Sequence, residues 1–283
     1  MAGTNPFIID DLLCNDPFES VFERIRDSIF YEYMSYRDYF NFLKIIESRL
    51  KDSYRKYGEI QPAVTRIMES YIVSNHQNDM IIRTQSEIMT KIQLDQESFI
   101  VFSQILLNKL GILVEKLVNA RSESNYAHSF SKHKEWFIKN NINPRYSQIL
   151  KQLHWYDQFL NFMRNKIIEH GSALSPMVTT TRYGIRYHRK KQTFGVLSDK
   201  DQMNLRMLIQ KYGLNDEKIR NINPNPYMML DEFVEVVLEN NIELETDDLR
   251  KLGEIVKNSG CILDAVLLAK HLTKFLNDVA ALF

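Results

Sequence analysis

The sequence predicts a mainly α-helical fold, in which a helical bundle carries a small β-hairpin insertion and a C-terminal helical module. Only nine Gly and seven Pro occur in 283 residues, too few for the many turns of a strand-rich fold. Apolar residues recur at spacings of three and four over long stretches, which is typical of amphipathic helices. Only one short stretch alternates with the period of a strand.

The composition is that of a globular protein with no overall charge. The 36 Lys and Arg balance 36 Asp and Glu, and 44% hydrophobic residues exclude disorder as the main state. Cys14 and Cys261 lie near opposite ends of the chain, which indicates small buried hydrophobes rather than a disulfide framework or a zinc site. The acidic N-terminal residues do not resemble a targeting peptide, and the longest uncharged candidate for a membrane span, 98–108, has 11 residues. We therefore expect a cytoplasmic protein with no membrane partner.

Two long helices are expected in the first part of the chain. The first runs from Pro17 to Tyr57, as one helix or two in tandem, and Gly58 and Pro62 are expected to end it. The second follows over 63–93. Tyr and Phe are dense in the first helix, and we interpret them as core residues rather than a base-stacking platform. They are Phe30, Tyr31, Tyr33, Tyr36, Tyr39, Phe40 and Phe42.

The next two helices flank a polar segment. One is expected from Asp95 to Leu117, and the polar stretch 119–131 is expected to be a loop. The following helix opens after Pro144, and its apolar positions step by four and three to Ile167. Continuing this series reaches His170, and Gly171 would then cap the helix.

A basic β-hairpin is expected over 173–198. Thr, Tyr and Val alternate with polar residues from Met177 to His188, a polar turn is expected at 189–191, and a second strand over 192–197. No acidic residue occurs between Glu169 and Asp199. The cations and an interleaved tyrosine are candidate RNA-binding residues, although a charged, protected strand edge is an alternative of similar weight. They are Arg182, Arg186, Tyr187, Arg189, Lys190 and Lys191.

The remainder, 199–283, is expected to be a helical module. Helices are predicted over 199–212, 227–240, 246–258 and from Ile262 onwards, the first capped by Ser198. The predicted domains are thus 1–172, 173–198 and 199–283. Nine acidic residues within 231–254 indicate a solvated acidic face, and a second hypothesis is that this face contacts the basic hairpin or a partner.

Most enzyme motifs are absent from the sequence. There is no P-loop, no dinucleotide-binding glycine pattern, no HExxH and no GxSxG, which disfavours nucleotide triphosphatases, dinucleotide enzymes, zincins and α/β-hydrolases. No histidine pair has metal-ligand spacing. His128 and His133 are the only weak metal candidates, and solvated loop histidines are the favoured interpretation.

One Arg–His pair stands at the end of the most periodic helix. Arg164, Asn165 and His170 resemble the Arg-x(4–6)-His motif of HEPN (higher eukaryotes and prokaryotes nucleotide-binding) ribonucleases, in which a polar residue often follows the Arg. Roughly one such spacing is expected by chance in this composition. The chain holds three, the others being Arg121 with His128 and Arg182 with His188, in a predicted loop and strand. The resemblance covers about 95–172 and implies a bundle of four to five helices.

The residue types of this motif suit metal-free RNA cleavage. A histidine can take the proton of a 2′-hydroxyl, and an arginine can stabilise the phosphorane by bidentate hydrogen bonds. On one helix Arg164 and His170 would lie about 120° apart and about 9 Å along the axis. The resemblance implies that two protomers combine their motifs, so a homodimer acting on RNA without metal or cofactor is expected.

Three functions remain open on the sequence. The first is a metal-independent endoribonuclease, for which the resemblance implies a defence or toxin–antitoxin role with a possible antitoxin or regulatory partner. The second is a non-catalytic helical RNA-binding or protein-interaction module. The third is a small-molecule or nucleotide sensor in which Arg164 and His170 bind phosphate without cleaving. For each motif residue, an ordinary structural role is the alternative: a core histidine, a salt-bridged arginine, a solvated asparagine.

Overall fold

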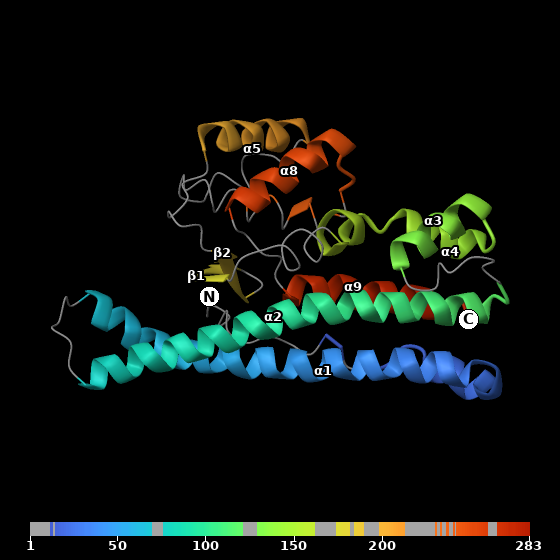
Figure 1. Cartoon of the computed structure of the whole chain (residues 1–283), viewed down its shortest axis with the longest axis horizontal. Helices are drawn as coiled ribbons and strands as arrows, with labels where there is room; N and C mark the ends of the chain where they lie inside the picture. The colour runs from blue at the N-terminus through green and yellow to red at the C-terminus, as the bar shows by residue number, and fades with distance from the viewer. Residues whose placement is uncertain are drawn as a thin grey trace, which may run out of the picture. The chain divides into compact units, whose positions relative to one another are not determined.

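The computed structural model is mainly helical, as expected (Figure 1). It describes residues 12–13, 15–69, 76–120, 129–161, 174–181, 184–189, 198–212, 230, 233, 236–237, 240, 242–259 and 265–283, and for 174–181 and 184–189 it describes only the backbone. The chain divides into two compact units. The first comprises 1–151, 180–185 and 264–283, and the second comprises 152–179 and 186–263.

The first unit is built on helix α1, Glu19–Glu69, which is longer than expected. The predicted end at Gly58 and Pro62 is wrong, because the helix continues through Pro62 for another seven residues. A proline inside a helix costs about 3 kcal/mol. Tyr57 and Val64, on either side of Pro62, are both buried, so tertiary packing offsets this cost. The one departure from helical dihedrals is at Ile25, whose carbonyl accepts a hydrogen bond from the Ser28 hydroxyl at 2.8 Å.

Helix α2, His76–Leu117, runs antiparallel beside α1 (Figure 1). The sequence predicted two helices meeting near Asp95, but α2 is continuous there. Asp95 does not begin a helix; its buried carboxylate pairs at 2.7 Å with Arg49 of α1. A second link joins the helices where the amide of Gln96 donates to the hydroxyl of Tyr54 at 2.6 Å.

The stretch Asp79–Leu117 is long and apolar enough to cross a membrane by length and composition. Its most apolar window has a mean hydropathy of 1.5, and 56% of that window is buried inside the protein. The sequence prediction used only the uncharged run 98–108 and understated this stretch. Burial on this scale is also typical of a core helix.

Aromatic rings fill much of the core beside α1, as predicted for part of the set. Tyr33, Tyr36 and Phe40 are buried, and the Tyr33 ring stacks on Phe22 with centroids 4.1 Å apart. Tyr33 also donates a hydrogen bond to Asp16 at 2.8 Å. The expectation is wrong for three others, which are exposed: Phe30, Tyr31 and Phe42.

Two shorter helices, α3 (Phe130–Asn140) and α4 (Pro144–Lys151), complete the first unit together with α9 (Ala265–Ala280). Asn141 ends α3 in the left-handed conformation with φ 47°. Helix α9 packs against α2 and α4, and its Thr273 hydroxyl donates to the carbonyl of Leu12 at 3.1 Å. The last predicted helix of the 199–283 module thus belongs to the first unit.

The single helix predicted from Pro144 to His170 is interrupted. Helix α4 ends at Lys151, Gln152 forms a turn, and helical structure resumes at His154. From Tyr156 to Leu160 it is a π-helix, η2, closed by a hydrogen bond from the N–H of Asn161 to the carbonyl of Tyr156. Periodicity could not reveal this break, because the apolar series Ile149, Leu153 and Tyr156 continues across it with steps of four and three.

Strands β1 (Leu174–Thr181) and β2 (Gly184–Arg189) pair into a two-stranded sheet. Their bounds differ from the prediction, which placed one strand over 177–188 and a turn at 189–191. That first predicted strand is divided between β1 and β2, and Arg189 ends β2.

The second unit contains η2 and two helices that contact each other, α5 (Asp199–Lys211) and α8 (Thr246–Ser259). Both lie close to their predicted ranges. Ser198 caps α5 as predicted, since its hydroxyl accepts a hydrogen bond from the N–H of Asp201 at 3.1 Å. The predicted helix 227–240 is described only at five separate residues.

Candidate functional site

The predicted catalytic residues Arg164, Asn165 and His170 lie outside the described residues. The described chain ends at Asn161, three positions before Arg164, and resumes at Leu174. Their catalytic roles therefore stay predictions.

The segment that leads into this motif is helical and anchored. Trp155, Tyr156 and Leu160 are buried, which fixes one face of residues 154–161 in the second unit. The π-helical turn at 156–160 is the last turn that the structure describes before the motif. Such turns are uncommon, and they occur frequently at functional sites.

Half of the predicted RNA-binding residues belong to the sheet. Arg186, Tyr187 and Arg189 lie in strand β2, which pairs with β1. Arg182, Lys190 and Lys191 lie outside the described residues. Strand β2 thus carries two predicted cations and a tyrosine within four consecutive positions.

A buried polar cluster of three residues lies in the first unit, where α2, α3 and α4 carry one residue each. His133 of α3 is only 2% exposed, its Nδ1 lies 2.9 Å from a carboxylate oxygen of Glu115, and its Nε2 lies 3.0 Å from the hydroxyl of Tyr146. The carboxylate of Glu115 accepts from Nδ1–H, which leaves Nε2 to accept the Tyr146 hydroxyl proton. Each polar atom of the imidazole is satisfied by one partner.

Burial keeps this imidazole neutral. Desolvation lowers the pKa of His133, against a smaller opposing effect of the hydrogen bond to Glu115. The predicted solvated loop histidine is therefore wrong at His133, which lies inside α3. Phe130, His133 and Phe137 follow one another at spacings of three and four, and this pattern in the sequence could have revealed the buried face.

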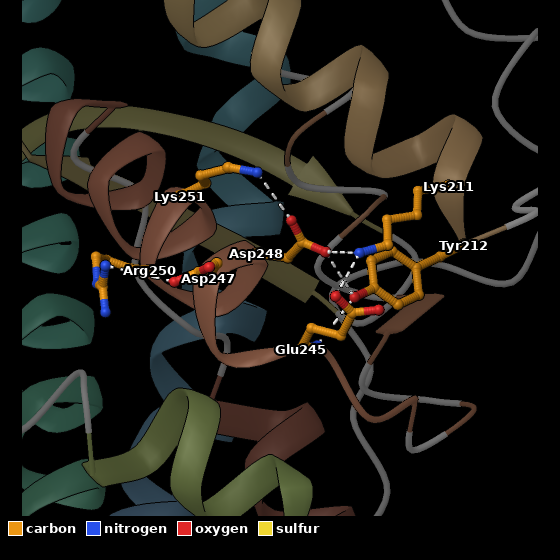
Figure 2. Close-up of polar contacts among 7 residues, drawn as sticks. All are labelled: Lys211, Tyr212, Glu245, Asp247, Asp248, Arg250 and Lys251. Atoms are coloured by element: carbon orange, nitrogen blue, oxygen red, sulfur yellow. Dashed lines mark hydrogen bonds and ion pairs between the residues drawn. The ribbon is translucent and has the colours of Figure 1, made fainter.

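A second polar cluster joins α5 to α8 in the second unit (Figure 2). The carboxylate of Asp248 accepts hydrogen bonds from the Lys211 ammonium at 2.5 Å, the Tyr212 hydroxyl at 3.0 Å and the Lys251 ammonium at 3.0 Å. The Tyr212 hydroxyl also accepts from the N–H of Glu245 at 2.9 Å. The hydrogen bond from Lys211 contributes most to lowering the pKa of Asp248 to about 2.

The acidic face predicted for 231–254 is confirmed for some members and wrong for one. The side chains of Glu243, Glu245 and Asp247 are 76%, 71% and 78% exposed, whereas that of Asp248 is 5% exposed. Asp248 is the internal acceptor that holds α5 on α8. Its described partners are Lys211 and Tyr212 at the end of α5 and Lys251 of α8.

No group of three or more His, Cys, Asp or Glu arranged to hold a metal ion occurs among the residues that the structure describes. Of the two weak metal candidates, His133 has both ring nitrogens engaged with Glu115 and Tyr146, and His128 lies outside the described part of the chain. Neither of the two described polar clusters contains Arg164, Asn165 or His170, or any of the predicted RNA-binding residues.

Comparison with known proteins adds no assignment. No protein-family model matches this chain, and neither the curated proteins nor the solved structures compared with it include a significant match. The arguments for function rest on the chain itself.

Proposed function

We propose that this protein is a metal-independent endoribonuclease of the HEPN type, with Arg164, Asn165 and His170 as its catalytic residues. The observation that carries the proposal is the Arg–Asn–x4–His order, which begins four positions after the end of the π-helical turn 156–160. The mainly helical fold is compatible with a HEPN-like bundle. The ring of Tyr156 in that turn is buried, and its packing holds the helical segment that precedes the motif.

In the proposed reaction, neutral His170 takes the proton of a ribose 2′-hydroxyl. The 2′-oxygen attacks the adjacent phosphorus, the bond from phosphorus to the 5′-oxygen breaks, and the leaving 5′-oxygen takes a proton from an imidazolium. The products are a 2′,3′-cyclic phosphate and a 5′-hydroxyl. Arg164 stabilises the negative charge of the phosphorane, and Asn165 holds the arginine or contacts RNA.

The basic stretch from Arg182 to Lys191 would bind the RNA. Its cations are Arg182, Arg186, Arg189, Lys190 and Lys191. Contacts with phosphates release counterions, so binding weakens as salt rises, and Tyr187 can stack on an unpaired base. Stacking of an aromatic side chain requires an unstacked base, which favours single-stranded or loop RNA as substrate.

The biology that follows is a defence or toxin–antitoxin role in the cytoplasm. A homodimer would combine two motifs, and an antitoxin or regulatory partner would restrain the nuclease. No cofactor is required for the reaction, because the histidine and arginine supply the proton transfer and the charge stabilisation.

The test compares wild type with His170→Ala and Arg164→Ala on one RNA and its DNA counterpart, with and without EDTA. The chain offers a matched control pair, Arg121→Ala and His128→Ala, which has similar spacing in a segment predicted as a loop. We expect RNA cleavage that tolerates EDTA, leaves cyclic phosphate ends, and falls by about 100-fold or more in the two motif variants only. Cleavage that survives in His170→Ala, or that requires added metal, would exclude this site.

A non-catalytic interaction module is the second candidate, and the exposed aromatic residues of α1 favour it. Phe30 and Phe42 are 44% and 47% exposed, and Tyr31 is 82% exposed. Aromatic side chains are enriched in protein interfaces. RNA binding without cleavage in the same assay, unaffected by either motif variant, would support this function.

A further inference from the structure

One side of α1 carries a regular series of residues, six of them exposed and two, Ser35 and Asp52, half-buried. Their spacing alternates between three and four. Each member lies two positions after a buried residue of α1, which places the series about 200° around the helix from the core. This series, the α1 stripe, consists of Tyr31, Ser35, Asp38, Phe42, Ile45, Arg49, Asp52 and Lys56. It extends about 38 Å along one helix.

The centre of the α1 stripe is apolar. Phe42 is 47% exposed and Ile45 is 55% exposed. The Phe42 ring is held by two neighbours, since its centroid lies 5.8 Å from that of Tyr39 and 5.8 Å from that of Phe102 on α2. Ordered apolar side chains bind a partner at a lower entropic cost than mobile ones.

The residues on the two sides of this centre follow a specific order, and the first charge on one side is opposite in sign to the first charge on the other. Reading outward from the midpoint between Phe42 and Ile45, one direction meets Asp38, Ser35 and Tyr31, and the other meets Arg49, Asp52 and Lys56. If the same helix is laid antiparallel against itself about that midpoint, Phe42 faces Ile45 and Asp38 faces Arg49. Ser35 then faces Asp52, and Tyr31 faces Lys56.

Each of these facing pairs is favourable. Asp38 offers a carboxylate to Arg49, whose side chain is 61% exposed and whose guanidinium has donors beyond the one engaged by Asp95. Within one copy Asp52 already pairs with Arg55 and Lys56. Its carboxylate can also accept from the hydroxyl of Ser35, and the Tyr31 ring can lie against the paired Lys56 side chain. A surface that complements itself in this way is what an interface with two-fold symmetry requires.

We propose that the α1 stripe binds the α1 stripe of a second copy of this chain, antiparallel and about a two-fold axis that passes between Phe42 and Ile45. The stripe carries two acids and two bases, so it lacks the positive charge that RNA would need. The four charges along one line also exclude burial in lipid. The interface does not depend on the proposed nuclease, and it uses none of the motif residues.

The experiment measures self-association of the full chain by sedimentation velocity across a concentration series. Two variants introduce one charge each into the apolar centre: Phe42→Lys and Ile45→Asp. The combined variant F42K/I45D places an ammonium opposite a carboxylate twice across the axis. Ile142→Asp, at an exposed isoleucine outside the stripe, is the matched control. Circular dichroism checks that each variant keeps its helices.

We expect wild-type dimers at about 100 µM or below. Each single variant should weaken association by about tenfold or more, F42K/I45D should recover part of it, and the control should match wild type. Asp38→Arg should weaken association, whereas Asp27→Arg, exposed on α1 but off the stripe, should not. A monomeric wild type, or dimers indifferent to both single variants, would overturn the proposal while leaving the nuclease assay unaffected.

Discussion

The Nε2 atom of His133 lies 3.0 Å from the hydroxyl oxygen of Tyr146, and both residues are buried. With Glu115 engaging the other nitrogen, this hydrogen bond fixes which imidazole nitrogen carries the proton. The contact joins α3 to α4 inside the first unit.

Tyr146→Phe should therefore destabilise the protein by about 1–3 kcal/mol, because it leaves a buried imidazole nitrogen without a donor. Urea unfolding followed by circular dichroism measures this change. Tyr31→Phe is the control, since the Tyr31 side chain is 82% exposed and should change stability by less than about 0.5 kcal/mol. Equal effects of the two changes would contradict the role of the hydrogen bond.

Gly111 gives His133 the space it occupies. A Cβ atom at Gly111 would lie 3.2 Å from both Cγ and Nδ1 of the ring, and the two hydrogen bonds of the ring prevent it from moving aside. We expect Gly111→Ala to destabilise by about 1–3 kcal/mol despite the better helix propensity of alanine. Gly58→Ala within α1 should instead stabilise the protein by up to about 1 kcal/mol. The two substitutions should therefore change the free energy of unfolding in opposite directions in one unfolding assay.

Asp248→Asn tests the contact between α5 and α8. The substitution removes the negative charge of the carboxylate that accepts hydrogen bonds from Lys211 and Lys251. The free energy of unfolding should therefore fall by about 1–3 kcal/mol. Asp247→Asn changes the neighbouring, 78% exposed carboxylate and should have little effect. Thermal unfolding of the two variants provides the comparison.

The same cluster has a defined pH dependence. Because the pKa of Asp248 falls from 3.8 to about 2 on folding, its contribution is present above pH 3.8 and is lost as the pH falls towards 2. The difference in stability between wild type and Asp248→Asn should shrink over that interval. A difference that stays constant from pH 5 to about 2 would mean that the carboxylate charge is not the source of stability.

His271 on α9 should make the first unit sensitive to mild acid. Burial, with Lys270 and Lys274 nearby, lowers its pKa from 6.5 to about 4, so the unfolded chain binds the extra proton first as the pH falls. The contribution of neutral His271 to the free energy of unfolding is complete above pH 6.5. It decreases as the pH falls towards 4, by roughly 2 kcal/mol when the partial exposure of His271 is taken into account. Urea unfolding at both ends of this interval should show a smaller decrease for His271→Gln than for wild type.

The sequence predicted the helical class and several helix ranges because these depend on local patterns. The cap at Ser198 follows from local chemistry and is confirmed. Continuation of α1 through Pro62 could not be predicted, since burial of Tyr57 and Val64 comes from the tertiary fold. The turn at Gln152 was not predicted, because the spacing of the apolar residues continues across it unchanged.

The polar clusters were harder to predict than the helices. Nothing in the sequence distinguishes Asp248 from its acidic neighbours. It is an internal residue because Lys211 and Tyr212, at the end of α5, form hydrogen bonds with its carboxylate in the folded protein. His133 carried a signal in its spacing from Phe130 and Phe137, which the polar segment before it obscured. The motif Arg164–His170 rests on sequence order alone.

The position of α9 has a consequence for synthesis on the ribosome. The first unit draws on 1–151 and again on 264–283, so the whole second unit is translated before the first is complete. Until α9 emerges, α2 and α4 lack its buried partners, among them Leu272 and Phe275. The nascent chain must hold an unfinished apolar surface while more than a hundred residues are added, a period in which such surfaces are prone to aggregate.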